Sequence, residues 1–371
     1  MDGVGDYTRR LAVEVASRGH QCFLLSLADA RISKATAGNL GSGAFVVPSL
    51  RLPATDSWRE RVRQAKAFCA HVDPDWISWQ IVPYGYHSRG LSFGLGKRFQ
   101  EISGGRRNQI MFHEIWIGEA AQSSVKNKVV GKFQQHIILD LLQRLRPLVV
   151  HTHTPLYQHL LGNIRYPATI LPLFGNIPIA AQLNPDWLKE KWPEGWGEFD
   201  LADRKSWWIF VMFGSIHPEW DPEDFWQRAT EAGQRTGRKC ALISIGRPGT
   251  IGERMLRQIQ KRESESWHLL TLGEQSEEDI SQCLLMADFG VSAAPPEYIY
   301  KSGTAVALIE HGLQVIATRP MYHYRHCPPE TVSDGMRNVR IDFHLEGMKK
   351  TQPGSLLPIV ATQFIEDLSG A

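Results

Sequence analysis

The sequence predicts an α/β protein built from two consecutive domains, each a parallel sheet covered by helices on both faces. Short apolar segments alternate with amphipathic, helix-periodic segments along most of the chain. The apolar segments are nearly continuous, which is typical of strands buried on both faces. With 371 residues, 43% of them hydrophobic, the chain can bury two sizeable cores.

Residues 1–175 hold the first set of alternating elements and are predicted to form the N-terminal domain. Strands are predicted at residues 21–27, 44–50, 75–82, 108–114, 148–153 and 168–174. Helices are predicted at residues 5–18, 56–72, 121–146 and 155–163. This alternation favours parallel strands joined by crossover helices.

Residues 176–206 lack clean periodicity and are rich in Pro, Gly, Trp and charged residues, so they are predicted to be a linker. The alternation restarts at residue 207, and residues 207–355 are predicted to form the C-terminal domain. Its predicted strands are 207–214, 239–246, 267–273, 287–294 and 313–318, and its predicted helices are 221–235, 250–263, 276–286 and 302–311. Residues 356–371 are predicted to be a C-terminal tail.

Composition narrows the class of protein. The net charge is only +2, and basic residues do not form a stripe with aromatic ones, which argues against nucleic-acid binding. Residues 1–205 carry 25 Lys and Arg against 18 Asp and Glu, so either an anionic surface or substrate is bound there, or this is ordinary surface charge. The five cysteines form no C-x-x-C pair, which favours a reducing compartment. The sequence has no long apolar stretch and no signal-peptide pattern, so we expect a cytoplasmic protein. If the protein contacts a membrane, we expect it to lie at the inner face.

The strongest chemical signal lies where the last predicted helix begins. Lys301, Ser302, Gly303 and Thr304 stand at this helix start. Backbone N–H groups in a first helical turn lack partners, and the helix dipole attracts an anion. Glycine lets a ligand approach the backbone, and the lysine adds a full positive charge. The pattern predicts a diphosphate site; the alternative is that Ser302 or Thr304 only caps a surface helix.

Four stretches resemble, in chain order, motifs of the retaining family-4 group of GT-B glycosyltransferases. The opening DGVGDYTRRLAVEVASRGHQ resembles the glycine loop and first helix of that family, and IMFHEIW resembles its strand end with a histidine beside the sugar. FVMFGSIHPEWDPEDF resembles the first strand and loop of its C-terminal domain, and EHGLQVIAT the end of its phosphate-binding helix. The resemblance implies two Rossmann-like domains facing a cleft. It also implies transfer of a sugar, with retention, from a nucleotide-diphosphate donor to a glycan or lipid-linked acceptor, in polysaccharide or cell-envelope glycan synthesis.

The same resemblance implies the site residues. His113 and Glu114 are the expected catalytic residues, with His113 hydrogen-bonded to the transferred sugar. The expected donor-binding residues are Gly3, Gly5, Gly214, Ser215, Arg247, Glu297, Lys301, Ser302, Gly303, Thr304 and Glu310. We expect no metal and no cofactor, because the helix dipole and a cation would stabilise the leaving diphosphate.

Two departures from the family pattern leave other functions open. Ala307 stands where the second family glutamate is usual, so Glu310, one turn later, is the candidate replacement, and Glu297 lies near the place of the first glutamate. The loop FGSIHPEWDPED lacks the usual Arg and Lys, for which Lys301 and Arg247 are the candidates. The alternatives are a catalytically degenerate nucleotide-binding or scaffold subunit, and a sugar-nucleotide epimerase, for which the sequence offers no evident catalytic carboxylates.

The sequence opens on the glycine loop, whereas in the GT-B fold a strand precedes that loop. We therefore expect the first strand to be absent from this chain. A start codon placed too late explains this better than a trimmed chain or a fold that tolerates the loss. Losing a central parallel strand would leave two neighbours with unpaired backbone groups.

Other patterns point to weaker conclusions. GVG is not a dinucleotide fingerprint, since Thr8 replaces the third glycine, and HEIWI lacks the second histidine of a zinc protease, which Ile117 replaces. His151 and His153 share one face of a strand, and we interpret them as a structural pair because no third metal ligand is evident. If the acceptor is lipid-linked, the basic helical face formed by Arg59, Arg61, Arg63 and Lys66 is a candidate for membrane contact. The alternative is that this face is only solvated.

Overall fold

The computed structural model describes residues 3–41, 45–192, 201–262, 264, 266–324, 327–333, 338–340 and 345–371. The chain divides into two compact units. Unit 1 comprises Met1–Pro172, His323–Val332 and Leu357–Ala371, and unit 2 comprises Leu173–Tyr322 and Ser333–Leu356. Residue 44 of the first-domain strands, residues 193–200 of the predicted linker and residue 263 of a predicted helix lie outside the described residues.

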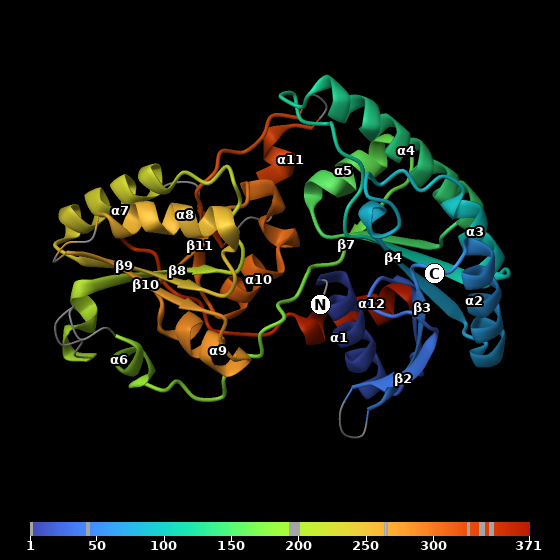
Figure 1. Cartoon of the computed structure of the whole chain (residues 1–371), viewed down its shortest axis with the longest axis horizontal. Coiled ribbons are helices and arrows are strands. Elements are labelled where there is room, and N and C mark those ends of the chain that lie inside the picture. Colours follow the sequence, from blue (N-terminus) through green and yellow to red (C-terminus); the bar gives the residue numbers. More distant parts are fainter. Residues whose placement is uncertain are drawn as a thin grey trace. The chain divides into compact units, whose positions relative to one another are not determined.

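Unit 1 contains two sheets and the helices around them (Figure 1). Its strands are β1 (Leu24–Asp29), β2 (Thr36–Leu40), β3 (Val47–Pro53), β4 (Trp76–Ile81), β5 (Arg107–Phe112), β6 (Val149–Thr152) and β7 (Thr169–Ile170). Its helices include α1 (Gly3–Ser17), α2 (Trp58–Val72), α3 (Leu95–Ser103), α4 (Val125–Leu145), α5 (Pro155–Asn163) and α12 (Leu357–Ser369). Within it, Ser57, Ser124 and Thr154 cap the helices that follow them, which is why the predicted starts of α2, α4 and α5 lie close to the observed ones.

The sheets of unit 1 differ from the single parallel sheet that the sequence predicts. Strand order is β1-β3-β2 in one sheet and β4-β5-β6-β7 in the other. Strand β2 runs antiparallel to β3 and was not predicted, because most of its residues are exposed and its sequence, TAGNL, is weakly apolar. Among the described residues, β1 and β4 therefore each form the outer strand of a sheet.

The predicted C-terminal tail forms helix α12, which belongs to unit 1 and packs against α1. Arg18 of α1 donates to the Pro358 carbonyl oxygen at 2.6 Å and to Thr362 Oγ1 at 2.5 Å. Further along α12, Gln363 donates to the carbonyl oxygen of Ile170 in β7. Helix α12 thus joins the first helix of unit 1 to its last strand.

Unit 2 contains a six-stranded parallel sheet of order β10-β9-β8-β11-β12-β13. The strands are β8 (Trp207–Phe213), β9 (Lys239–Ile245), β10 (Trp267–Gly273), β11 (Phe289–Ser292), β12 (Gln314–Ala317) and β13 (Val339–Arg340). Helices α7 (Pro222–Thr236) and α8 (Gly249–Gln260) cover one face, and α9 (Glu277–Met286) and α10 (Gly303–Glu310) cover the other (Figure 1). The first five strands and all four helices were predicted to within a few residues.

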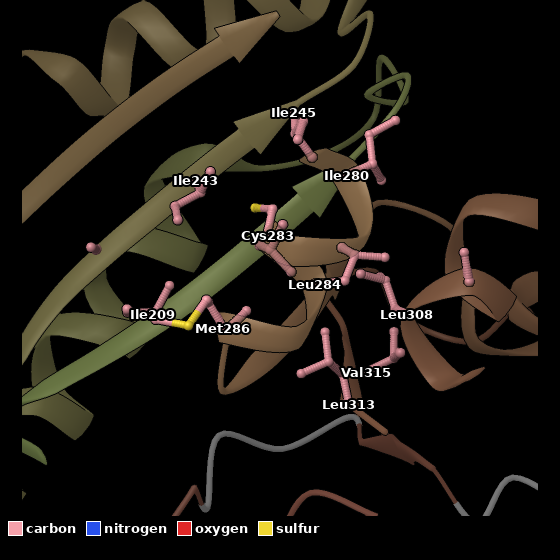
Figure 2. Packing of buried hydrophobic residues seen from close by; sticks show 14 of the residues in the cluster. Ile209, Ile243, Ile245, Ile280, Cys283, Leu284, Met286, Leu308, Leu313 and Val315 are labelled. Carbon is pink, nitrogen blue, oxygen red and sulfur yellow. The ribbon is translucent and has the colours of Figure 1, made fainter. Parts of the chain in front are cut away.

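Successive residues of one strand enter different cores, as the two-residue period of a strand requires. Ile209 and Val211 of β8 pack beneath α9 and α10, whereas Phe210 and Met212 pack beneath α7 and α8. Figure 2 shows the first core, where Ile209, Ile243 and Ile245 of the sheet meet Cys283 and Leu284 of α9. Burial on both faces explains why these strands read as continuous apolar segments.

The predicted linker contains helix α6 (Trp187–Lys191), which packs on α9. Trp187 is buried and donates its indole N–H to Asp279 at 2.7 Å, and the Asn184 backbone N–H donates to Gln282 at 2.8 Å. This part of the segment therefore belongs to the body of unit 2. Helices α6 and α11 (Pro329–Ser333) were missed because each has only five residues.

Candidate functional site

Strand-end glycines shape one edge of the sheet in unit 2. Gly214, Gly246 and Gly273 stand at the carboxyl ends of β8, β9 and β10, with φ of 84°, 94° and 66°. The Gly214 N–H donates to the Ile245 carbonyl oxygen, and the Gly246 N–H donates to that of Gly273. A Cβ on Gly214 would lie 2.8 Å from Thr304 Cγ2, so the end of β8 closely approaches the start of α10. In parallel α/β sheets, ligands bind at this carboxyl edge.

Helix α10 begins where the sequence predicts a diphosphate site. Ser302 is its N-cap and accepts a hydrogen bond from the Ala305 N–H, and its hydroxyl lies 3.1 Å from that of Thr304. A Cβ built on Gly303 would meet no atom within 4 Å. Ser302 therefore caps the helix, which both interpretations allow. The open space beside Gly303 also leaves room for a ligand against the first turn.

The two predicted cations lie in different surroundings. Lys301 Nζ stands 5.0 Å from the centroid of the Tyr298 ring, directly before α10. Arg247 follows Gly246, is largely exposed and forms an ion pair with Glu274. An exposed ion pair contributes little to stability, so Arg247 is only loosely held. Ser215, the residue after Gly214, is exposed.

The two predicted glutamates are buried and contact the backbone of unit 2. Glu297 accepts a hydrogen bond from the Tyr322 N–H at 3.1 Å. Glu310 accepts one from the Leu356 N–H at 2.7 Å, and a side chain on Gly175 would collide with its carboxylate. Each carboxylate thus holds a chain segment in place, and a role toward a ribose stays a prediction.

A buried cation that the sequence did not reveal lies beyond β12. Arg319 is 5% exposed and donates to Glu219 and to Tyr322 Oη, and its Nη1 lies 3.1 Å from His217 Nδ1. Burial and the Arg319 guanidinium lower the pKa of His217 against the opposing effect of Glu219, which favours the neutral ring that can accept. His217 and Glu219 belong to the loop after β8, which lacks the usual Arg and Lys of the resembled family. The sequence signal was only an arginine two residues after a strand, because two of its partners, His217 and Glu219, are about 100 residues away in the chain.

In unit 1, His113 and His153 form a buried pair just beyond β5 and β6. His113 Nδ1 lies 2.9 Å from His153 Nε2, and His113 Nε2 lies 2.8 Å from Gln80 Oε1. His153 Nδ1 donates to the Leu171 carbonyl oxygen at 3.0 Å. The Tyr7 ring of α1 packs edge-on against both imidazoles. Both ring nitrogens of His113 are therefore bonded within unit 1, and a sugar hydroxyl must displace Gln80 to reach Nε2.

The other predicted residues of unit 1 are placed as follows. Glu114 is partly buried, and its N–H points to the Ile81 carbonyl oxygen at 3.5 Å. Gly3 and Gly5 lie in the first turn of α1 rather than in a loop before the helix. Of the predicted basic face of α2, Arg59, Arg63 and Lys66 are exposed, whereas Arg61 is buried beneath Trp58 and donates to the Leu27 carbonyl oxygen.

Two classes of site are absent from the described part of the chain. No group of three or more His, Cys, Asp or Glu side chains there is arranged to hold a metal ion. His151 lies on the same strand face as His153, but its ring bonds Gln109 and Asp367. No helix among the described residues is long and apolar enough to span a membrane.

Comparison with known proteins identifies the fold. No family profile and no curated protein matches the sequence. Among solved structures, the chain is similar to Anabaena HepE in complex with UDP, with 13% identity, a TM-score of 0.52, and coverage of 98% of this chain and 87% of that one. It is also similar to α,α-trehalose 6-phosphate synthase from Burkholderia multivorans, with 10% identity, a TM-score of 0.51, and coverage of 100% and 96%.

The chain therefore has the GT-B fold, as its motifs predicted. At this level of identity the comparison is one of fold. The more particular resemblance, to the retaining family-4 group, stays a prediction that rests on the motifs.

Proposed function

We propose that this protein is a glycosyltransferase that moves a sugar from a nucleotide-diphosphate donor to a hydroxyl of a glycan or lipid-linked acceptor. The observation that carries this proposal is the start of α10, where Gly303 is open and the strand-end glycine Gly214 lies alongside. The similar HepE structure holds UDP, a nucleoside diphosphate, which is the ligand that such a helix start attracts.

In this proposal the diphosphate lies against the first turn of α10. The backbone N–H groups and the helix dipole supply about half an elementary charge, which is less than the charge on a leaving diphosphate. Lys301, directly before the helix, supplies a full charge. Arg319, which is buried, adds a second cation near the same sheet edge, where Glu219 and Tyr322 hold it. Because these groups neutralise the developing charge, we propose that the transfer needs no metal.

In unit 1, His113 is the group proposed to contact the transferred sugar through Nε2, after Gln80 moves aside. Glu114 follows it in the chain and is the second proposed catalytic residue. The motif resemblance supports retention of the anomeric configuration and a place in polysaccharide or cell-envelope glycan synthesis. Both belong to the proposal.

The described surface of unit 1 offers a second candidate for membrane contact besides the α2 face that the sequence suggested. Val125, Val129 and Phe133 recur every four residues on α4 and are 77%, 51% and 50% exposed. Lys126 and Lys132 flank them, and α4 has no acidic residue in its first half. An apolar ridge with basic flanks fits an anionic lipid surface. We propose that this surface of α4 contacts the cytoplasmic leaflet.

Vesicle co-sedimentation tests the α4 surface. Wild-type protein should sediment with phosphatidylglycerol vesicles more than with phosphatidylcholine vesicles, and the double variant Val129→Ser, Phe133→Ser should lose that difference. The variant Arg63→Ser probes the α2 face that the sequence suggested; it should sediment like the wild type, because Arg63 already pairs with Glu60. Equal sedimentation of the wild type with both vesicle types would dispose of the membrane contact.

Binding and turnover test the function itself. Thermal unfolding with UDP, ADP and GDP should show stabilisation by at least one of them, since a ligand at 100 times its Kd adds about 2.7 kcal/mol. Slow hydrolysis of the matching nucleotide sugar should then identify a catalyst. Stabilisation without any hydrolysis or transfer would point instead to a nucleotide-binding subunit, and no stabilisation by any nucleotide would reject the proposal.

A further inference from the structure

A continuous chain of hydrogen bonds crosses one face of the β4-β5-β6-β7 sheet and ends on α12. Starting from the His113–His153 pair, Gln80 Nε2 donates to Ser78 Oγ at 2.7 Å, and Ser78 Oγ donates to Gln109 Oε1 at 2.5 Å. Gln109 Nε2 lies 3.0 Å from His151 Nδ1. The far end of the chain is His151 Nε2, which lies 2.8 Å from Asp367 Oδ2 of α12.

The bonds of this chain need one more hydrogen than its neutral groups can supply. Seven hydrogen bonds link the Leu171 carbonyl oxygen to the Asp367 carboxylate, and both ends only accept. Three neutral imidazoles and one hydroxyl supply one hydrogen each. Each amide also supplies one, because its nitrogen faces only one neighbour in the chain and its oxygen faces the other, so the neutral groups supply six. The seventh hydrogen must be an additional proton. An imidazole holds it rather than Asp367, because a carboxylic acid is much the stronger acid.

The orientation of the amides decides which imidazole carries the charge. Gln109 donates to His151 Nδ1, so a neutral His151 can still donate to Asp367. At the other end, Gln80 presents an oxygen to His113, and Leu171 presents one to His153, so these two rings need three hydrogens between them. The additional proton therefore belongs to the His113–His153 pair.

Groups on the packed elements are compatible with this assignment. From α1, Tyr7 packs edge-on against both rings of the pair, and burial raises the pKa of its hydroxyl, so it stays neutral. From α12, Phe364 lies against His151 and Asp367 bonds it. Glu114 follows His113 in the chain, and together with burial it raises the pKa of Tyr157 on α5, so Tyr157 also stays neutral.

We propose that Gln80, Ser78, Gln109, His151 and Asp367 are positioning residues that keep one additional proton on the His113–His153 pair. His113 Nε2 is then a charge-assisted hydrogen-bond donor, stronger than a neutral imidazole, when an oxygen of the substrate replaces Gln80. This last step rests on the proposed function. The protonation state does not, because the chain lies within unit 1 and needs no ligand.

Nuclear magnetic resonance of the full chain labelled with ¹⁵N-histidine tests the proposal, since ring-nitrogen shifts report charge and tautomer. Single His→Gln variants assign the three rings among the 14 histidines. In Asp367→Asn, the amide can donate to His151 and supply the seventh hydrogen. In Gln80→Met, the acceptor at His113 Nε2 is gone. In both variants the pair should lose its proton at a pH about one unit or more below that of the wild type, a tenfold change in proton affinity.

The variant Glu366→Gln is the matched control, because it removes the same charge from the neighbouring, exposed residue of α12. It should titrate like the wild type. Three rings in the wild type that are all neutral at pH 7 would overturn the proposal. So would variants Asp367→Asn and Gln80→Met that both titrate like the wild type. If one of them fails to fold, the other still decides. A failure here leaves nucleotide binding by unit 2 untouched, so the two proposals fail separately.

Discussion

The variant Gly303→Ala tests whether the start of α10 is a ligand site or only a capped helix end. Apart from its chain neighbours and the backbone of its own helix, the new methyl group would meet no protein atom within 4 Å, and Gly303 has no left-handed φ. Alanine also favours a helix over glycine, by about 1 kcal/mol in a helix interior, and limits the unfolded chain. The variant should therefore be as stable as the wild type or up to about 1 kcal/mol more stable, which corresponds to a rise of roughly 2–4 °C in Tm.

Nucleotide binding should respond in the opposite direction. The methyl group would occupy the space through which a phosphate oxygen reaches the backbone of the first turn. Loss of one hydrogen bond to a charged group costs about 1.5–3 kcal/mol, so affinity should fall roughly tenfold to more than a hundredfold. The control for the stability measurement is Gly214→Ala. There φ is 84°, and the new methyl group would lie 2.8 Å from Thr304 Cγ2. That variant should lose about 1 kcal/mol or more of stability, because the backbone strain adds to the displacement of Thr304.

Titration calorimetry with the nucleoside diphosphate that stabilises the wild type measures the binding loss, and thermal unfolding measures stability. The expected pattern for Gly303→Ala is intact stability with weakened binding. Wild-type affinity in this variant would refute the placement of the diphosphate at α10. A clear loss of stability would instead refute the open space beside Gly303.

Three further predictions follow from named contacts. In calorimetry, Lys301→Ala should weaken nucleotide binding roughly tenfold to more than a hundredfold. Arg247→Ala should bind nearly as the wild type, because Arg247 already pairs with Glu274 at the surface. The reverse order of effects would place the diphosphate beside Arg247 instead. His311 is buried and burial lowers its pKa, so the unfolded chain binds more protons below about pH 6.5 and stability falls there; His311→Gln should flatten that fall in denaturant titrations at pH 5–7. Gly131→Ala would drive a methyl group into the carbonyl of Ile117 and should lower stability by about 1–3 kcal/mol in chemical unfolding, and an unchanged midpoint would contradict the packing of α4.

Local features were readable from the sequence because their causes are local. Strands β8 to β12 are buried on both faces and appear as continuous apolar segments, and capping residues such as Ser124 and Ser276 mark helix starts. The start of α10 was predicted within a residue for the same reason. Strand β2 was missed because an exposed five-residue strand has no core-facing apolar pattern.

Contacts between distant segments could not be read in this way. Nothing near Arg319 in the sequence points to His217 or Glu219, which meet it only because β8 and β12 both pair with β11. His151 lies on β6 and His153 just beyond it, and their bonds to Gln109 and His113 depend on the pairing of β5 with β6.

The sequence by itself determined the α/β class and the helix start at Ser302–Thr304, because apolar periodicity, glycine placement and capping act over a few neighbouring residues. The GT-B fold was implied by the resemblance of its motifs to a known family. The tertiary structure decided which side chains are free to act. It turned Glu310 toward the backbone, bonded both ring nitrogens of His113, and brought Asp367 of the last helix to His151, 216 residues earlier in the chain. A side chain's partners depend on sheet order and helix packing, and these are properties of the whole folded unit.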